Sequence, residues 1–149
     1  MPKKGFTLIE LMLVTIIMGI LTLVAVPLFK KTYDRFEFEN FSKSVYYLIQ
    51  YLQNSAIVEK KIYYLNIDAE KAKFVANSFE NGEKVALKGR FTKVFKAPKA
   101  IKVNIEPEAE YICFLPNGKI DDLSIIFTDR FEKKIIINTK NINNDIQIQ

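Results

Sequence analysis

The chain of 149 residues contains no histidine and only one cysteine, Cys113. The absence of histidine removes histidine-based general acid–base catalysis and histidine metal ligands. A lone cysteine excludes a disulfide within the chain. The sequence also lacks a nucleophile motif and a glycine-rich phosphate-binding loop. We therefore expect neither an enzyme nor a protein that holds a cofactor or a metal ion.

Charged residues are nearly absent from residues 6–29, where Glu10 is the only one. As an α-helix with a rise of 1.5 Å per residue, this apolar run spans about 36 Å, more than a hydrocarbon core of about 30 Å. A carboxylate inside such a segment costs about 2.5–3.5 kcal/mol on insertion scales. We therefore predict that the run crosses a membrane and that Glu10 has a specific role there.

The length and the flanks of the run bear on two ordinary explanations. A secretory signal peptide has 7–15 apolar residues and a small-residue cleavage site, whereas this run is longer and ends at Phe29 without such a site. A plain signal anchor stays open as an alternative, because basic residues flank the run on both sides. These residues are Lys3 and Lys4 before it, and Lys30, Lys31 and Arg35 after it.

The segment from Gly5 to Glu10, Gly-Phe-Thr-Leu-Ile-Glu, resembles the processing site of type IV pilins and of the pseudopilins of type II secretion. The resemblance implies that a prepilin peptidase cuts between Gly5 and Phe6 and methylates the new N-terminus on Phe6. It also implies that Glu10 of an incoming subunit neutralises the amine of a subunit already in place, which offsets the desolvation of both charges. A capping box, in which Thr7 caps the helix and Glu10 reaches back to the Thr7 N–H, is the structural alternative.

The helix is predicted to continue beyond the membrane, from about Thr7 to about Glu59. Apolar residues recur there at steps of three to five, and no glycine or proline interrupts residues 28–81. The predicted amphipathic stripe comprises Phe29, Tyr33, Phe36, Phe41, Val45, Leu48, Leu52 and Ala56. Pro27 lacks a backbone N–H and is predicted to loosen the helix, either as a hinge or as a tolerated membrane proline.

After Lys61 the pattern changes from helical to extended. Two strands flanking a polar turn at residues 68–71 predict a hairpin, and Asn81-Gly82 and Asn117-Gly118 predict further turns. The predicted strands are 62–67, 73–76, 100–105, 111–115, 123–127 and 134–139, with a last edge strand around Ile142, Ile146 and Ile148. Alternation of Leu123, Ile125 and Phe127 indicates one buried face. The expected fold class is α+β, a long N-terminal helix packed on a C-terminal antiparallel β domain.

The C-terminal half is similar to the GspH/FimT family of minor pseudopilins and minor pilins, on the strength of residues 114–118, 123–127 and 134–137. The resemblance implies a β domain of two small sheets. It also implies a structural subunit of an inner-membrane-assembled helical fibre, the type II secretion pseudopilus that drives protein export across the outer membrane. A minor type IV pilin involved in pilus assembly or DNA uptake is the alternative.

The same resemblance divides the chain into four parts. These are a prepilin leader (1–5), the transmembrane and assembly half of the helix (6–29), its amphipathic half (30–61) and a periplasmic β domain (62–149). The expected location is the bacterial inner membrane, crossed once. The expected partners are other pilin or pseudopilin subunits, the prepilin peptidase and the inner-membrane assembly platform.

Residues 84–105 are basic and contain no acidic side chain. The basic residues are Lys84, Lys88, Arg90, Lys93, Lys96, Lys99 and Lys102, with Phe91 and Phe95 among them. Such a segment binds DNA or anionic lipid headgroups with a steep salt dependence. A solvated loop or an edge strand protected by lysines explains it equally well.

Two smaller features complete the expectations. Asn117, Asp121 and Asp122 are residue types that commonly coordinate calcium, but their spacing matches no known calcium loop and suits an ordinary turn. Cys113 falls in a predicted strand and is expected to be a small buried hydrophobic residue.

Overall fold

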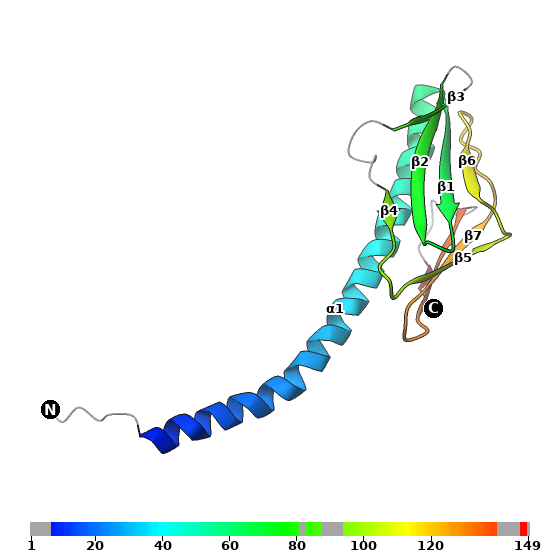
Figure 1. Cartoon of the computed structure of the whole chain (residues 1–149). Helices are drawn as coiled ribbons and strands as arrows, with labels where there is room; N and C mark the ends of the chain where they lie inside the picture. Colours follow the sequence, from blue (N-terminus) through cyan, green and yellow to red (C-terminus); the bar gives the residue numbers. More distant parts are fainter. Residues whose placement is uncertain (1–6, 81–82, 88–93, 140–146, 149) are drawn as a thin grey trace. The chain divides into compact units, whose positions relative to one another are not determined.

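The structure is a computed structural model that describes residues 7–80, 83–87, 94–139 and 147–148. It divides into two compact units, Met1–Phe36 and Glu37–Gln149. Helix α1 (Leu8–Glu59) contributes to both units, whereas every described strand belongs to the second (Figure 1). The predicted helix from Thr7 to Glu59 is therefore confirmed to within one residue.

The two ends of α1 follow from local backbone chemistry. The carbonyl of Thr7 accepts hydrogen bonds from the backbone N–H groups of Glu10 and Leu11, both at 3.2 Å, so Thr7 is the N-cap. After Glu59, Lys60 adopts a φ of 53°, the left-handed conformation that commonly terminates a helix. The chain leaves the helix there and starts its first strand at Ile62.

The described strands form two antiparallel sheets. One sheet has the order β3-β2-β1-β6, with β4 also paired to β2, and the other has the order β5-β7-β8-β9. The strands are β1 (Ile62–Asp68), β2 (Lys73–Glu80), β3 (Glu83–Ala86), β4 (Phe95–Lys96), β5 (Lys102–Glu106), β6 (Tyr111–Phe114), β7 (Ser124–Thr128), β8 (Lys134–Asn138) and β9 (Gln147–Ile148). The α+β fold class and the two sheets are confirmed.

The predicted β1–β2 hairpin is present, and its turn is held by Asp68. The backbone N–H of Lys71 donates to Asp68 Oδ1 at 3.0 Å, and Lys71 Nζ lies 3.3 Å from Asp68 Oδ2. The hydrogen bond from this N–H lowers the pKa of the Asp68 carboxyl. The turn predicted at Asn81-Gly82 lies outside the described residues. The strands on either side of it, β2 and β3, pair with each other, and Glu80 lies opposite Glu83.

The second predicted turn, at Asn117-Gly118, is also confirmed. The N–H of Gly118 donates to the carbonyl of Leu115 at 2.9 Å, and the N–H of Leu115 donates to Lys119 at the same distance. Pro116 takes the second position of this turn, for which its ring is pre-set, and Gly118 follows with a φ of +82°. This geometry joins a turn to a one-residue bulge.

Strands β3 and β4 were not predicted, because both fall in the lysine-rich segment whose polar composition hides the alternation. Both pair with β2, the second strand of the predicted hairpin. Of the isoleucines expected in a last edge strand, Ile148 lies in β9 beside β8. Ile142 and Ile146 lie outside the described residues.

The core of the second unit joins the helix to both sheets. Phe41 of α1, Phe74 of β2 and Phe127 of β7 have ring centroids 5.8–6.1 Å apart, so one aromatic cluster connects all three layers. In β1 and β7 alternate side chains are buried, as a sheet with one covered face requires. The buried helical residues are Phe38, Ser42, Val45, Leu48, Ile49, Leu52, Ser55 and Ala56.

The predicted helical stripe was wrong at its N-terminal end. Phe29, Tyr33 and Phe36 are 65–75% exposed, whereas Val45 and Leu48 are fully buried. The five-residue step from Phe36 to Phe41 turns the helix by about 140° relative to the starting face at 3.6 residues per turn. The first three aromatics therefore belong to a different face, and the stripe that packs on the sheets begins at Phe38.

Candidate functional site

The first unit presents an apolar helix surface on all sides. Every large apolar side chain from Leu8 to Phe29 is between 42% and 79% exposed. A helix that is apolar all round is stable only where something covers it, inside a core or within a membrane. By length and composition α1 is able to cross a membrane, and the only charge between Leu8 and Phe29 is Glu10.

Hydroxyl groups along this half of α1 are satisfied within the helix. The side chains of Thr15, Thr22 and Thr32 donate to the carbonyls of Met12, Met18 and Leu28 at 2.7–3.1 Å. Such bonds remove the need for water, so these threonines do not oppose an apolar environment.

Glu10 lies in the first turn of α1, where its backbone and its carboxylate have separate roles. Its backbone N–H donates to Thr7 Oγ1 at 3.4 Å, which confirms the cap but not the reciprocal half of a capping box. Within residues 7–80 and the other described segments, the Glu10 carboxylate has no hydrogen bond or ion pair, and the residue is exposed. The carboxylate therefore remains available to a partner outside the chain.

Two further residues of this half bear on how it packs. Gly19 has open space around it, because a Cβ built there would meet nothing within 4 Å. Pro27 lies inside α1, which continues through it. Pro27 offers no N–H to the carbonyl one turn earlier, and its role as a hinge stays a prediction. The predicted processing residues, Gly5 and Phe6, lie outside the described residues.

The structure describes the basic segment only in part. Lys96 in β4, Lys99 in the following turn and Lys102 in β5 are exposed. Lys84 lies in β3, and Lys88, Arg90 and Lys93 lie outside the described residues. A DNA-binding role for this segment remains a prediction.

Cys113 is half-buried rather than buried, which corrects the expectation. In β6 the side chains of Ile112 and Phe114 point into the core, so the alternation places Cys113 on the opposite face. There it pairs across the strands with Tyr64, whose ring contacts that of Tyr111 at 5.8 Å. Burial raises the pKa of the Cys113 thiol, and the Asp121 charge raises it further.

Two of the three residues considered for calcium, Asn117 and Asp121, bind backbone N–H groups. Asn117 Oδ1 accepts the N–H of Lys119 at 3.0 Å, and Asp121 Oδ2 accepts the N–H of Cys113 at 2.8 Å. Across the described residues, no group of three or more aspartate, glutamate or cysteine side chains is arranged to hold a metal ion. The contact of Asn117 fits the turn interpretation, and that of Asp121 joins its side chain to β6.

Residues 1–26 match the family described as the prokaryotic N-terminal methylation motif. The chain carries the N-terminal methylation motif of prepilin-type proteins. The match covers the apolar start of α1 together with Gly5, Phe6 and Glu10. No curated protein sequence matches the chain.

The fold of the chain is similar to those of minor pseudopilins and minor pilins. Two structures of the minor pseudopilin EpsH from the type II secretion system of Vibrio cholerae align with TM-scores of 0.64 and 0.61, at 12% and 9% identity, over 76% of this chain and 96% and 95% of theirs. The type IV minor pilin FimU of Pseudomonas aeruginosa aligns with a TM-score of 0.57 at 12% identity, over 77% of this chain and 90% of that chain. The pilin-like fold is thereby established independently of the motif.

Proposed function

We propose that this chain is a minor structural subunit of a fibre assembled from the bacterial inner membrane, of the kind that drives type II secretion. The observation that carries the proposal is the methylation motif at the start of a helix that is exposed and apolar all round. The two-sheet unit has the fold of both the minor pseudopilin EpsH and the minor pilin FimU, which supports a minor fibre subunit. The role is mechanical, without catalysis or a cofactor.

In this proposal the prepilin peptidase removes residues 1–5 and methylates Phe6. The helix from Phe6 to Phe29 then anchors the subunit in the membrane, with the sheets in the periplasm. On assembly through the inner-membrane platform, the same apolar surface packs against the helices of neighbouring subunits. The open space at Gly19 lets another helix approach closely, and Pro27 provides the bend as the helix leaves the bilayer.

Glu10 is proposed to pair with the methylated amine of Phe6 on a neighbouring subunit. An amine and a carboxylate each lose hydration in an apolar fibre core, and pairing offsets that loss. Capping does not compete with this role, because the cap uses the backbone N–H of Glu10 and its carboxylate has no partner in the described chain. A glutamine at this position keeps the cap and removes the charge.

Glu10→Gln in the full chain therefore tests the proposal. We expect normal membrane insertion and cleavage but a loss of subunit–subunit cross-links in native membranes. Glu59→Gln, which makes the same change at the exposed far end of α1, is the matched control and should cross-link like the parent. Equal cross-linking of the Glu10→Gln chain and the parent would show that the charge pair does not drive assembly.

The type of fibre is tested by mass spectrometry of proteins cross-linked to the chain in native membranes. Capture of major and minor pseudopilins supports the secretion fibre. Capture of type IV pilus subunits favours the alternative, a minor pilin that supports assembly or DNA uptake. If that pilin takes up DNA, the full chain in detergent should bind DNA through residues 84–105. No binding at about 50 mM salt would rule out this DNA-binding role, since such contacts are strongest at low salt.

A further inference from the structure

The turn between β7 and β8 carries an exposed aromatic side chain. Phe131 is 51% exposed, the highest value for a described phenylalanine of the second unit. Asp129 Oδ1 builds the turn, because it accepts the backbone N–H groups of Phe131 and Lys133, both at 2.8 Å. The N–H of Asp129 also donates to the carbonyl of Lys133 at 3.0 Å. The turn is thus held through its backbone, and Phe131 is left half exposed.

This turn lies at the end of the second unit where α1 enters it (Figure 1). The ion pair between Lys133 and Glu39, at 2.9 Å, fixes the turn to the helix there. At 1.5 Å per residue, about 15 Å of helix separates Glu39 from Phe29, the last residue of the apolar run. A headgroup layer of about 5–8 Å and two residues of extended chain together span a comparable distance. An anchored subunit therefore keeps the turn within reach of the membrane surface.

Exposed basic side chains gather at the same end of sheet β5-β7-β8-β9. Lys102 lies opposite Thr128, the last residue of β7, and Thr128 lies opposite Lys134, the first residue of β8. Residues opposite one another in antiparallel strands share a face, so the two lysines lie two strand spacings apart, about 10 Å. Neither lysine has an ion pair within the described residues. Together with Arg130 of the turn and Lys99 just before β5, both also exposed, they are here called the basic end.

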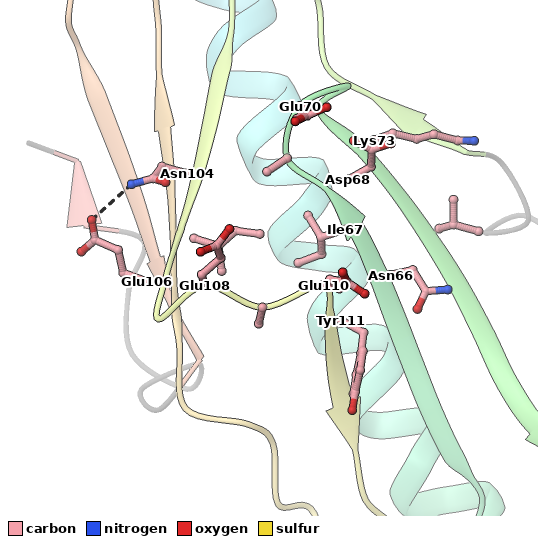
Figure 2. Close-up of a pocket in the computed structure, with 14 residues that line it drawn as sticks. Asn66, Ile67, Asp68, Glu70, Lys73, Asn104, Glu106, Glu108, Glu110 and Tyr111 are labelled. Atoms are coloured by element: carbon pink, nitrogen blue, oxygen red, sulfur yellow. Dashed lines mark hydrogen bonds between the residues drawn. The ribbon is translucent and has the colours of Figure 1, made fainter.

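Little negative charge offsets the basic end. In the described residues, Asp129 is bound to backbone N–H groups and Glu39 is in the ion pair, which leaves Glu132 as the exposed acidic residue of the turn. The acidic residue of β5, Glu106, lies at the far end of that strand, beside a groove lined by other acidic side chains (Figure 2). Like charges at the basic end therefore repel one another in the free chain, and a negatively charged surface relieves that repulsion.

We propose that the basic end and Phe131 dock on the anionic phospholipid surface of the membrane that anchors the subunit before assembly. Phe131 enters the boundary between headgroups and acyl chains, and the cations lie against the phosphates. The proposal rests on the anchoring of α1 proposed above, since the anchor holds the turn near the bilayer and a weak contact then suffices. This tether favours lipid over DNA, which is not held beside the chain. Assembly into the fibre breaks the contact, so it concerns only the waiting subunit.

A single tryptophan tests the docking, because the chain contains none. The full chain with Phe131→Trp is placed one copy per nanodisc of phosphatidylglycerol and phosphatidylcholine at about 50 mM salt, where screening is weak. Lipids brominated near the start of their acyl chains quench tryptophan at that depth, and we expect the fluorescence of this chain to fall about twofold. Tyr47→Trp, at an exposed position of α1 beyond Glu39, is the matched control and should keep its fluorescence.

Leu28→Trp, near the end of the apolar run, reports separately on the anchoring and should be quenched. If it is quenched and Phe131→Trp is no more quenched than Tyr47→Trp, the docking is overturned and the anchoring stands. No quenching of Leu28→Trp would instead contradict the anchoring on which both proposals rest.

The role of the charges is tested in the Phe131→Trp background. Lys102→Gln/Lys134→Gln should reduce the quenching at least twofold, because it removes cations that attract the anionic lipid. Lys60→Gln/Lys119→Gln makes the same charge change at exposed positions outside the basic end and should leave the quenching unchanged. Equal quenching in the two double variants would refute the contribution of the basic end. A fluorescence change on adding double-stranded DNA, without quenching by brominated lipid, would identify a nucleic-acid surface and overturn the proposal.

Discussion

Lys133 Nζ donates to Glu39 Oε1 at 2.9 Å, which joins the β7–β8 turn to helix α1 across 94 residues of sequence. The two side chains are only 25% and 27% exposed. Glu39 lies near the point where α1 enters the second unit, next to Phe38 and Phe41 of the core. The ion pair therefore holds the turn against the helix at the start of the folded unit.

The coupling free energy between Lys133 and Glu39 should be roughly 1 kcal/mol in favour of the folded state. This value is at the upper end of the range for ion pairs that are not fully buried. Lys133→Met keeps the aliphatic stem, and it spares the turn, because Asp129 Oδ1 accepts the backbone N–H of Lys133 at 2.8 Å. The measurement is a double-mutant cycle with Glu39→Gln, using chemical unfolding of the full chain in detergent. Strictly additive effects of the two substitutions would show that the pair contributes nothing.

A second prediction concerns Thr139, which is only 4% exposed although it is polar. Its Oγ1 accepts the N–H of Leu123 at 2.9 Å and donates to the carbonyl of Asp121 at 2.6 Å. Thr139→Val has nearly the same shape but leaves the N–H of Leu123 buried without a partner, which should cost about 1–3 kcal/mol. The free energy of unfolding of the full chain measures this cost.

Thr139→Ser is the matched control for that change, because it keeps the hydroxyl and removes the methyl group instead. It should cost about 1 kcal/mol through lost packing. A serine variant less stable than the valine variant would mean that packing, and not the hydrogen bond to Leu123, governs this site.

The third prediction concerns Gly118, whose φ of +82° lies in the left-handed region. Its carbonyl accepts a hydrogen bond from Gln53 Nε2 at 3.2 Å, and a Cβ at this position would lie 3.4 Å from Ile57 Cδ1. Gly118→Ala should destabilise the chain by about 1–2 kcal/mol, mostly through the backbone conformation. Gly118→Asn should cost less, because asparagine tolerates this region better. An alanine variant as stable as the parent would contradict the turn geometry.

The sequence was sufficient to predict elements whose cause is local. The helix boundaries follow from the cap at Thr7 and the change of periodicity after Lys61, and the Asn117-Gly118 turn follows from its residue types. The predicted stripe was wrong from Phe29 to Phe36, because the five-residue step from Phe36 to Phe41 turns the helix by about 140° and places the earlier aromatics on another face. The burial of Cys113 was also misjudged, because a strand of four residues gives too short an alternation to assign its faces.

A groove lined by acidic side chains was missed for a different reason; these are Asp68, Glu70, Glu106, Glu108 and Glu110 (Figure 2). Its walls come from the β1–β2 turn and the link after β5, which are distant in sequence and meet only through the packing of two sheets. The signal that was available is the alternation of glutamates at 106, 108 and 110 directly after the basic segment. Charge patterning identified the basic segment 84–105, whereas the grouping of these acidic side chains around one groove needed the fold.

The last prediction uses Cys113 as a reporter of its surroundings. Burial, followed by the Asp121 charge, raises the pKa of the thiol, while a hydrogen bond with Tyr64 lowers it. Because the thiolate is the reactive form, iodoacetamide should alkylate Cys113 of the folded chain at pH 8 more slowly than it alkylates the unfolded chain. A raised pKa also means that the thiol's contribution to stability is present at neutral pH and is lost as the pH rises through the folded-state pKa.

Asp121→Asn then separates charge from structure. The asparagine amide oxygen is still able to accept the N–H of Cys113, as Asp121 Oδ2 does at 2.8 Å, but the negative charge is gone. The thiol pKa should fall and alkylation at pH 8 should speed up, by roughly two- to fivefold for a fraction of a pKa unit. Asp122→Asn, next in the chain, makes the same change without this contact and should leave the rate unchanged. Equal rates in the two variants would show that the Asp121 charge does not act on the thiol.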